Sequence, residues 1–328
     1  MVECLPWHRD TWARIAGREQ HAHAYLLHGP AGIGKRQFAE RLVALLLCHS
    51  PMSGEPCGHC KSCSLLAAGT HPDHYIVQPE EVDKAIRVDQ IRALVEFVVQ
   101  TSQLGRRKVI LLEPAEAMNL NAANALLKSL EEPSGDTVIL MITHQLSRLL
   151  PTIKSRCVQQ RCPTPNTDDA IAWLDAQLPD CSFEQCRALL ALVGGSPLRA
   201  ATLFQQGGLE QRSAVVEGLK KLLKQQASPS QLAESWNAIG LGLIFDWCYD
   251  WMQAVLRYQM THDETELGAD DMAKVVQYLA DKSSTSKVLA LQDWLLSNRQ
   301  KILAKANLNR ALLLEALLVQ WAMLPRAR

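Results

Sequence analysis

A glycine-rich loop carries the first chemical signal in this chain. Residues 29–35 read Gly-Pro-Ala-Gly-Ile-Gly-Lys, after a short apolar run at 24–28 and before apolar residues at helical spacing in 36–48. In such a strand–turn–helix setting, the pattern G-x-x-x-x-G-K surrounds phosphates with backbone amides and brings a lysine to the outer pair. The residues expected to form this phosphate loop are Gly29, Gly32, Gly34 and Lys35.

Two positions near the loop lack the groups that hydrolysis requires. Residue 36 is Arg instead of the Ser or Thr whose hydroxyl would hold Mg²⁺, and a guanidinium offers no acceptor to a cation. The apolar run 108–112 ends in Glu113-Pro114, so a proline stands where a base would activate water. We therefore predict a nucleotide-binding fold that does not turn over ATP. Weak nucleotide binding through Lys35 and the loop amides stays open.

Four cysteines with metal-ligand spacing follow the loop. Cys48, Cys57, Cys60 and Cys63 lie close together in sequence, among glycines and a proline that permit tight turns. Four thiolates with this spacing suit a closed tetrahedral Zn²⁺ site with a structural role. An iron–sulfur cluster has a similar cysteine pattern and is the main rival. Replacement of one thiol by His49 or His59 is a further alternative, and the other six cysteines are expected to be ordinary thiols.

The pattern around these groups predicts the scaffold that positions them. The expected strands are 24–28, 74–77, 108–112 and 137–142, and the expected helices between them are 36–48, 88–99 and 121–130. This alternation predicts a doubly wound α/β domain with a parallel sheet. Beyond Pro163 the pattern is helical, with short helices expected at 167–178, 182–193 and 198–206. The last segment, 307–324, is apolar on more than one face, which predicts that it is buried in its own core or against a partner.

Composition excludes several classes of protein. The 328 residues include 34 Lys+Arg and 34 Asp+Glu, so the net charge is zero, whereas autonomous nucleic-acid binders usually carry a basic excess. The short basic run at 106–108 is a minor candidate for DNA contact. No run of 18 apolar residues predicts a membrane span, and the N-terminus lacks the layout of a signal peptide. We expect a cytoplasmic protein with reduced cysteines.

With these residues in hand, the sequence resembles the delta-prime subunits of bacterial DNA polymerase III clamp loaders, an AAA+ family. The resemblance covers essentially the whole chain and is strongest over 25–160. Besides the altered loop and the four cysteines, it rests on 69–73 (Gly-Thr-His-Pro-Asp), 124–133 (Asn-Ala-Leu-Leu-Lys-Ser-Leu-Glu-Glu-Pro) and 155–157 (Ser-Arg-Cys). The motor subunits of the same loader share the cysteines and Ser-Arg-Cys, but keep an intact Lys-Ser/Thr and Asp-Glu.

The resemblance implies an AAA+ P-loop domain (α/β, a parallel sheet flanked by helices), a small helical lid and an all-α C-terminal collar domain. We place these at 1–163, with the cysteine insertion at 48–63, at 164–207 and at 208–328. It implies a non-catalytic stator that supports ATP-driven loading of the sliding clamp onto primed DNA. The implied partners are the motor subunits (gamma/tau) and delta, with clamp and DNA reached through the complex. The chain would have no ATPase of its own within a DNA-directed DNA polymerase holoenzyme.

The resemblance also assigns individual residues. Arg156, in Ser-Arg-Cys, would act as an arginine finger in trans on ATP held by the neighbouring subunit. Thr143 matches the first sensor position of the family and Arg199 the second. A capping hydroxyl and an exposed helical arginine are the simpler interpretations of these two residues.

Two other functions remain to be weighed against this one. The chain could be an active clamp-loader ATPase with an unusual phosphate loop, in which case hydrolysis by the pure chain would depend on Lys35. It could also be a zinc-dependent nucleic-acid-binding module, against which the zero net charge counts.

Overall fold

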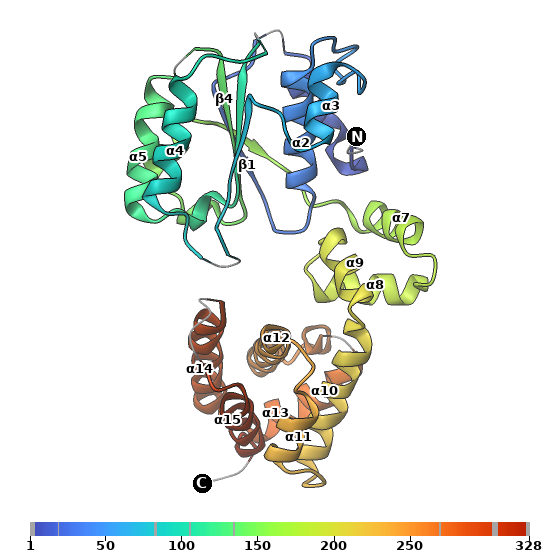
Figure 1. Cartoon of the computed structure of the whole chain (residues 1–328). Helices are drawn as coiled ribbons and strands as arrows, with labels where there is room; N and C mark the ends of the chain where they lie inside the picture. Colours follow the sequence, from blue (N-terminus) through green and yellow to red (C-terminus); the bar gives the residue numbers. More distant parts are fainter. Residues whose placement is uncertain are drawn as a thin grey trace. The chain divides into compact units, whose positions relative to one another are not determined.

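The computed structural model describes residues 4–18, 20–81, 84–104, 106–133, 135–268, 270–303 and 308–325. The chain divides into two compact units, 1–205 and 206–328. All strands found in the described residues belong to the N-terminal unit, and the C-terminal unit is helical (Figure 1).

A parallel sheet with strand order β2-β3-β4-β1-β5 organises the N-terminal unit. The strands are β1 (Ala24–His28), β2 (His74–Val77), β3 (Lys108–Leu112), β4 (Thr137–Thr143) and β5 (Val158–Arg161). β3 and β4 are buried along their whole length, which explains their nearly continuous apolar sequences. β5 was not predicted, because it is an edge strand reading Val-Gln-Gln-Arg with mostly exposed side chains.

Helices cover both faces of the sheet (Figure 1), and alternate residues of the strands belong to two separate cores. On one face, Tyr25 and Leu27 pack in a core that includes Phe38 and residues of α1 (Arg9–Ala16) and α2 (Lys35–Leu47). On the other face, Leu26 and Ile110 share a core with helices α4 (Val88–Val99), α5 (Leu120–Glu131) and α6 (Pro151–Lys154). The predicted α/β class, a parallel sheet flanked by helices, is confirmed.

Three short helices complete the N-terminal unit and contact one another. They are α7 (Thr167–Gln177), α8 (Phe183–Leu192) and α9 (Pro197–Gln205). The side chains of Asn166 and Ser182 accept hydrogen bonds from backbone N–H groups in the first turns of α7 and α8, as N-caps do. The division into three domains at 163/164 and 207/208 stays a prediction, since the two compact units meet at 205/206.

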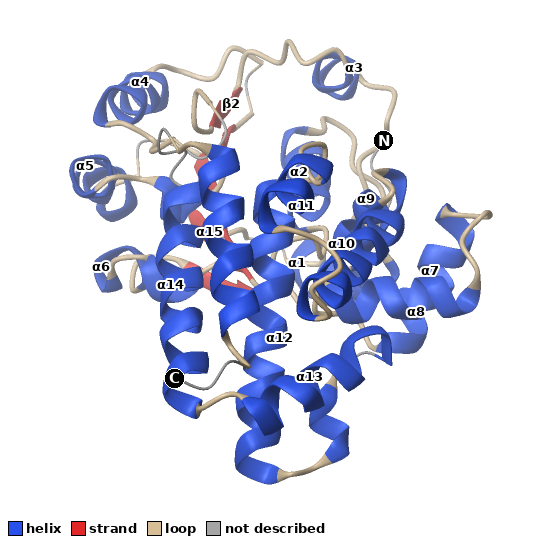
Figure 2. Cartoon of the chain, turned by 90° about the horizontal axis from the view of Figure 1, so that it is seen from below, coloured by secondary structure: helices blue, strands red, loops and turns tan. Residues whose placement is uncertain are grey.

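The described residues of the C-terminal unit form helices joined by loops, with no strand among them (Figure 2). Its helices are α10 (Gly208–Leu223), α11 (Pro229–Ser235), α12 (Leu241–Thr261), α13 (Asp270–Lys282), α14 (Thr285–Leu303) and α15 (Arg310–Met323). Trp321 is fully buried, with its ring edge-on to Trp251 at 6.0 Å between centroids. Arg212 is paired with Asp271 at 2.8 Å. The all-helical C-terminal region is therefore confirmed.

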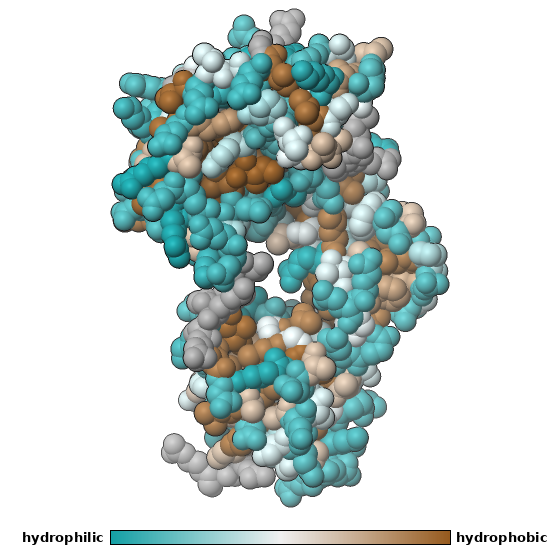
Figure 3. Space-filling view, viewed as in Figure 1, coloured by the Kyte–Doolittle hydropathy of each residue, from teal (hydrophilic) through white to brown (hydrophobic). Residues whose placement is uncertain are grey.

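The last helix carries both buried and exposed apolar residues. Asn307, where the predicted segment begins, lies outside the described residues. One side of α15 is buried in the unit's own core through Leu314, Leu317, Leu318 and Trp321. Leu312, Val319 and Met323 are exposed, and hydrophobic residues interrupt the hydrophilic surface of this unit (Figure 3). No helix among those described has the length and apolar character needed to cross a membrane.

Candidate functional site

The phosphate loop joins the end of β1 to the start of α2, where the sequence predicted it. Gly32 and Gly34 have φ values of 77° and 88°, a left-handed conformation that glycine adopts without strain. Gly34 is the N-cap of α2, so the loop amides lie at a helix N-terminus, the arrangement that favours phosphate groups. The shape of a phosphate loop is therefore preserved.

The lysine of the loop is engaged by the loop itself. Lys35 is 2% exposed, and its Nζ donates to the carbonyl oxygens of Gly29, at 2.7 Å, and of Pro30. Burial lowers the pKa of Lys35 to about 8, although nearby Cys162 and Glu113 act in the opposite direction. Backbone carbonyl oxygens of the loop thus already accept the hydrogen bonds of the Lys35 ammonium. A bound phosphate would have to replace these carbonyl oxygens as the acceptor.

The N-terminal segment covers the loop from one side. Trp7 Nε1 donates to the carbonyl oxygen of Ile33 at 2.8 Å, and His8 Nε2 lies 2.7 Å from the same oxygen. Leu5 is so close to Gly34 that a Cβ at this glycine would lie 2.0 Å from Leu5 Cδ1. Sequence reasoning missed these three residues, because 5–8 has no motif or periodicity that signals a contact with the loop.

The helical segment α7–α9 contacts the loop as well. Ser196 Oγ donates to the carbonyl oxygen of Ala31 at 2.8 Å, and the N–H of Leu198 donates to that of Gly32 at 3.2 Å. Arg199, the predicted second sensor, lies with its aliphatic carbons against Gly32: a Cβ there would be 2.4 Å from Arg199 Cγ. The structure thus brings Arg199 to the loop.

Arg36, the altered residue after the loop lysine, binds Glu113, the carboxylate that survives at the end of β3. Arg36 Nη1 contacts Glu113 Oε2 at 2.8 Å, and Arg36 Nε contacts Glu40 Oε1 at 2.6 Å. Partial burial acts to lower the pKa of Arg36, but the hydrogen bonds that Arg36 donates to Glu113 and Glu40 outweigh it, and the pKa is raised. The guanidinium therefore supplies the positive charge beside Glu113 that a metal ion would otherwise supply. The sequence showed Arg36 and Glu113 as separate features, and the structure joins them.

Thr143, the predicted first sensor, ends β4 and is fully buried. It pairs in register with His28, the residue that immediately precedes the loop. Its Oγ1 accepts a hydrogen bond from the N–H of Gln145 at 3.2 Å. Thr143 thus lies beside the loop and also serves as a local cap, so the geometry is compatible with both interpretations.

Arg156 lies between α6 and β5, and its side chain is 32% exposed. Arg156 Nη2 contacts Glu131 Oε1 at 2.5 Å, and Arg156 Nη1 donates to the carbonyl oxygen of Thr152 at 2.9 Å. Within the described part of the chain, these contacts and a longer one to Ser155 are the polar contacts of its guanidinium, and none goes to the phosphate loop.

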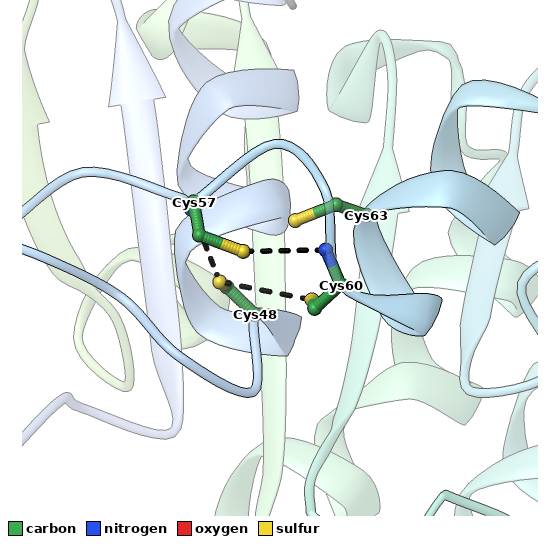
Figure 4. A group of neighbouring side chains, drawn as sticks. All are labelled: Cys48, Cys57, Cys60 and Cys63. Atoms are coloured by element: carbon green, nitrogen blue, oxygen red, sulfur yellow. Dashed lines mark hydrogen bonds between the residues drawn. The ribbon is translucent and has the colours of Figure 1, made fainter.

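The four predicted metal ligands come together beside the sheet (Figure 4). Cys48 follows the end of α2, and Cys60 and Cys63 lie at the start of α3 (Lys61–Ala67). The four sulfur atoms lie within 4.8 Å of one another, and Cys48 Sγ is 4.0 Å from Cys60 Sγ. Tetrahedral zinc with Zn–S bonds of about 2.3 Å needs sulfurs about 3.8 Å apart. The cluster could therefore bind a metal ion.

The electrostatics of the cluster differ between its thiols. Burial acts to raise the pKa of Cys60, but backbone N–H groups of Cys63 and His49 donate to its sulfur, and the pKa falls to about 6. Burial raises the pKa of Cys63 to about 12. His49 and His59 are exposed, and neither joins the ligand group found among the described residues.

Two residues of the basic run at 106–108 make contacts within the protein. Lys108 is 4% exposed, donates to the carbonyl oxygen of Phe97 and lies 4.6 Å from the centre of its ring. Arg107 is paired with Asp136 at 3.2 Å. These contacts disfavour the minor hypothesis of DNA binding through this run.

The sheet with its phosphate loop, the Arg36–Glu113 pair and the cysteine cluster define an altered P-loop α/β protein. A family model described as "DNA polymerase III, delta subunit" matches residues 8–165, and one described as "DNA polymerase III, delta subunit, C terminal" matches 206–323. "DNA polymerase III subunit delta'" of Pseudomonas aeruginosa is 66% identical over 325 residues, 99% of this chain and 99% of the relative. The chain belongs to the DNA polymerase III delta-prime subunit family, as the sequence resemblance predicted.

Other relatives are more distant. The delta-prime subunit of Escherichia coli K12 is 30% identical over 330 residues, covering 96% of this chain and 94% of the relative. "DNA polymerase III subunit tau" of Salmonella typhimurium is 33% identical over 168 residues, 47% of this chain and 25% of that protein. Among solved structures, a gamma subunit-related protein of Thermotoga maritima has a TM-score of 0.45 and 21% identity, covering 97% of this chain and 99% of that one.

Proposed function

We propose that this chain is a non-catalytic stator of the DNA polymerase III clamp loader, which supports ATP-driven loading of the sliding clamp onto primed DNA. Membership of the delta-prime family supports the assignment of the chain to this complex. The observation that carries the non-catalytic role is the ion pair between Arg36 and Glu113. Arg36 stands at the position whose hydroxyl would hold magnesium, and it neutralises the surviving carboxylate of Glu113 with the chain's own cation, while Pro114 stands where the base would prime water.

Arg156 is proposed as the group that this chain contributes to chemistry. A guanidinium placed against a γ-phosphate stabilises charge that develops in the transition state of phosphoryl transfer. The side chain of Arg156 is partly exposed, and none of its polar contacts among the described residues goes to the chain's own phosphate loop. Both observations support action on a neighbouring subunit. Thr143 and Arg199 are proposed to retain the family's sensor positions without a hydrolytic role here.

The remaining assignments follow from the same role. We propose that the C-terminal unit joins the collar with the motor subunits (gamma/tau) and delta, and that the protein acts in the cytoplasm. The exposed apolar residues of α15 support a contact of this kind. Zinc is proposed as the metal of the four-cysteine cluster, because a closed set of four thiolates leaves no open position for catalysis.

Phosphate release by the isolated chain tests the non-catalytic role. With Mg·ATP at millimolar concentration, the wild-type chain is expected to release phosphate no faster than Lys35→Ala, because the Lys35 ammonium and Glu113 are already engaged. Release that the Lys35→Ala substitution abolishes would show an active ATPase and overturn the stator role.

A further inference from the structure

The ion pair between Arg156 and Glu131 has no role in the function described so far. Glu131 is the last residue of α5, and its carboxylate contacts the guanidinium at 2.5 Å. The side chains are 32% and 47% exposed, so both are accessible to solvent and to another subunit. The Thr152 carbonyl oxygen fixes a second nitrogen of the same guanidinium.

The position of Glu131 argues against a role in helix stability. A carboxylate in the last turn of a helix meets the negative end of the helix dipole, which disfavours it by a few tenths of a kcal/mol or more. The contact with Arg156 is what compensates this charge among the described residues. Glu131 is therefore better explained by what it does to the arginine than by what it does to α5.

We propose that Glu131 is a positioning residue that holds Arg156 in a waiting position and releases it to the triphosphate of the neighbouring subunit. This inference rests on the proposed function, in which Arg156 is the finger. The step exchanges one ion pair for another, and no covalent bond changes. A γ-phosphate carries more negative charge than one carboxylate, so it can displace Glu131, whose own charge then stands free in solvent.

The exposure of the pair sets the size of the effect. Ion pairs between exposed side chains are weak and are screened by salt. The competition between Glu131 and the nucleotide should therefore change the apparent affinity for ATP about two- to fivefold at low salt. It should leave the chemical step almost unchanged, because Glu131 is absent from the transition-state contact.

The test is the DNA-stimulated ATPase of a loader reconstituted with delta, clamp and motor subunits whose own Ser-Arg-Cys arginine is replaced by Ala. In this background, the ATP site of the neighbouring motor subunit that faces Arg156 is the site that still has an arginine finger. We expect Glu131→Gln to lower the KM for ATP about two- to fivefold with kcat unchanged. The difference should shrink when salt is raised. Glu132→Gln removes the same charge one residue later and should leave KM unchanged.

Three results separate the possible failures. A KM that is unchanged in Glu131→Gln, or lowered equally by Glu132→Gln, would overturn the positioning role. A fall in kcat would also overturn it, because it would mean that Glu131 supports the active pose of Arg156. If Arg156→Ala leaves the rate in this background unchanged, or the background itself has no activity, the finger assignment fails, and the inference on Glu131 falls with it.

Discussion

At the scale of residues, the loss of hydrolytic groups is compensated by a new contact. Glu113 is only 16% exposed, yet its charge is paired with Arg36, which Glu40 holds from the other side. The charges of Arg36 and Glu113 are therefore both paired. A surviving carboxylate at 113 therefore does not indicate a surviving metal site.

Removal of this carboxylate should be measurable as a loss of stability. Glu113→Ala is expected to lower the free energy of unfolding by about 1–2 kcal/mol, because a hydrogen-bonded charge is lost from a largely buried position. Glu40→Ala removes the more exposed i,i+4 partner and should cost no more than about 0.5 kcal/mol. Urea unfolding of both variants checks this, and equal losses would contradict the central place of the Arg36–Glu113 pair.

The histidine that begins β2 should make stability depend on pH. Burial, with His71 and Arg36 nearby, lowers the pKa of His74 to about 4, against an ordinary value of 6.5. As the pH falls from 6.5 to 4, the unfolded chain takes up a proton that the folded chain does not, so the free energy of unfolding falls. His74→Gln should reduce this fall by about 1–2 kcal/mol.

Urea unfolding at pH 7 and at pH 4.5 measures the effect of His74. His262→Asn is the control, since His262 is exposed and its φ of 52° suits asparagine. If His74→Gln and the wild type lose the same stability between these pH values, the proposed linkage is wrong.

Sequence reasoning succeeded for residues whose roles have local signatures. The phosphate loop and the four cysteines were recognised from spacing alone, and the structure brings each group together. The self-satisfied Lys35 and the cover formed by Trp7 and His8 were not foreseen, because they depend on tertiary contacts that leave no pattern in the sequence.

At the scale of elements, the cysteine insertion should depend on its metal. Cys60 is the N-cap of α3 and Cys48 directly follows α2, so a shared ion would tie the two helices together. We expect about one zinc per chain, and we expect Cys60→Ser to lose the metal and to lower the Tm of the N-terminal unit. Cys4→Ser, outside the cluster, should retain it. Metal analysis decides the matter, and iron with a brown colour would contradict zinc.

Close packing of α10 on α11 leaves no room for a side chain at Gly218 in the C-terminal unit. A Cβ at Gly218 would lie 2.6 Å from the ring of Trp236, whereas a Cβ at Gly242 in α12 meets nothing within 4 Å. Gly218→Ala should therefore cost about 1–3 kcal/mol through overpacking. Gly242→Ala should be neutral or slightly stabilising. Thermal unfolding compares the two, and similar Tm values would contradict the packing described.

Elements with strong periodicity were predicted nearly to the residue, whereas elements with a weak pattern, β5 among them, were not predicted. Predicted strands at 24–28, 74–77 and 108–112 coincide with β1, β2 and β3. β5 escaped because an edge strand buries little, so its sequence need not be apolar. The stop of α5 at Glu131 agrees with the predicted break before Pro133.

At the scale of the whole molecule, the family, the α/β unit and the helical C-terminal unit all follow from the sequence and are confirmed. The roles of Arg156 and Glu131 could not be derived in the same way. Their proposed function depends on another subunit, so a single chain shows only the contacts that each residue makes at rest. These roles therefore have to be tested by measurements on the assembled loader.

The most direct measurement compares two variants in the assembled loader with wild-type delta and motor subunits. We predict that Arg156→Ala lowers the DNA-stimulated ATPase rate at the served site by about 10³-fold or more, as loss of a finger does, and thereby lowers the total rate. Lys35→Ala should leave the total rate unchanged, because this chain's own loop takes no part in turnover. A rate that falls with Lys35→Ala and not with Arg156→Ala would contradict the account.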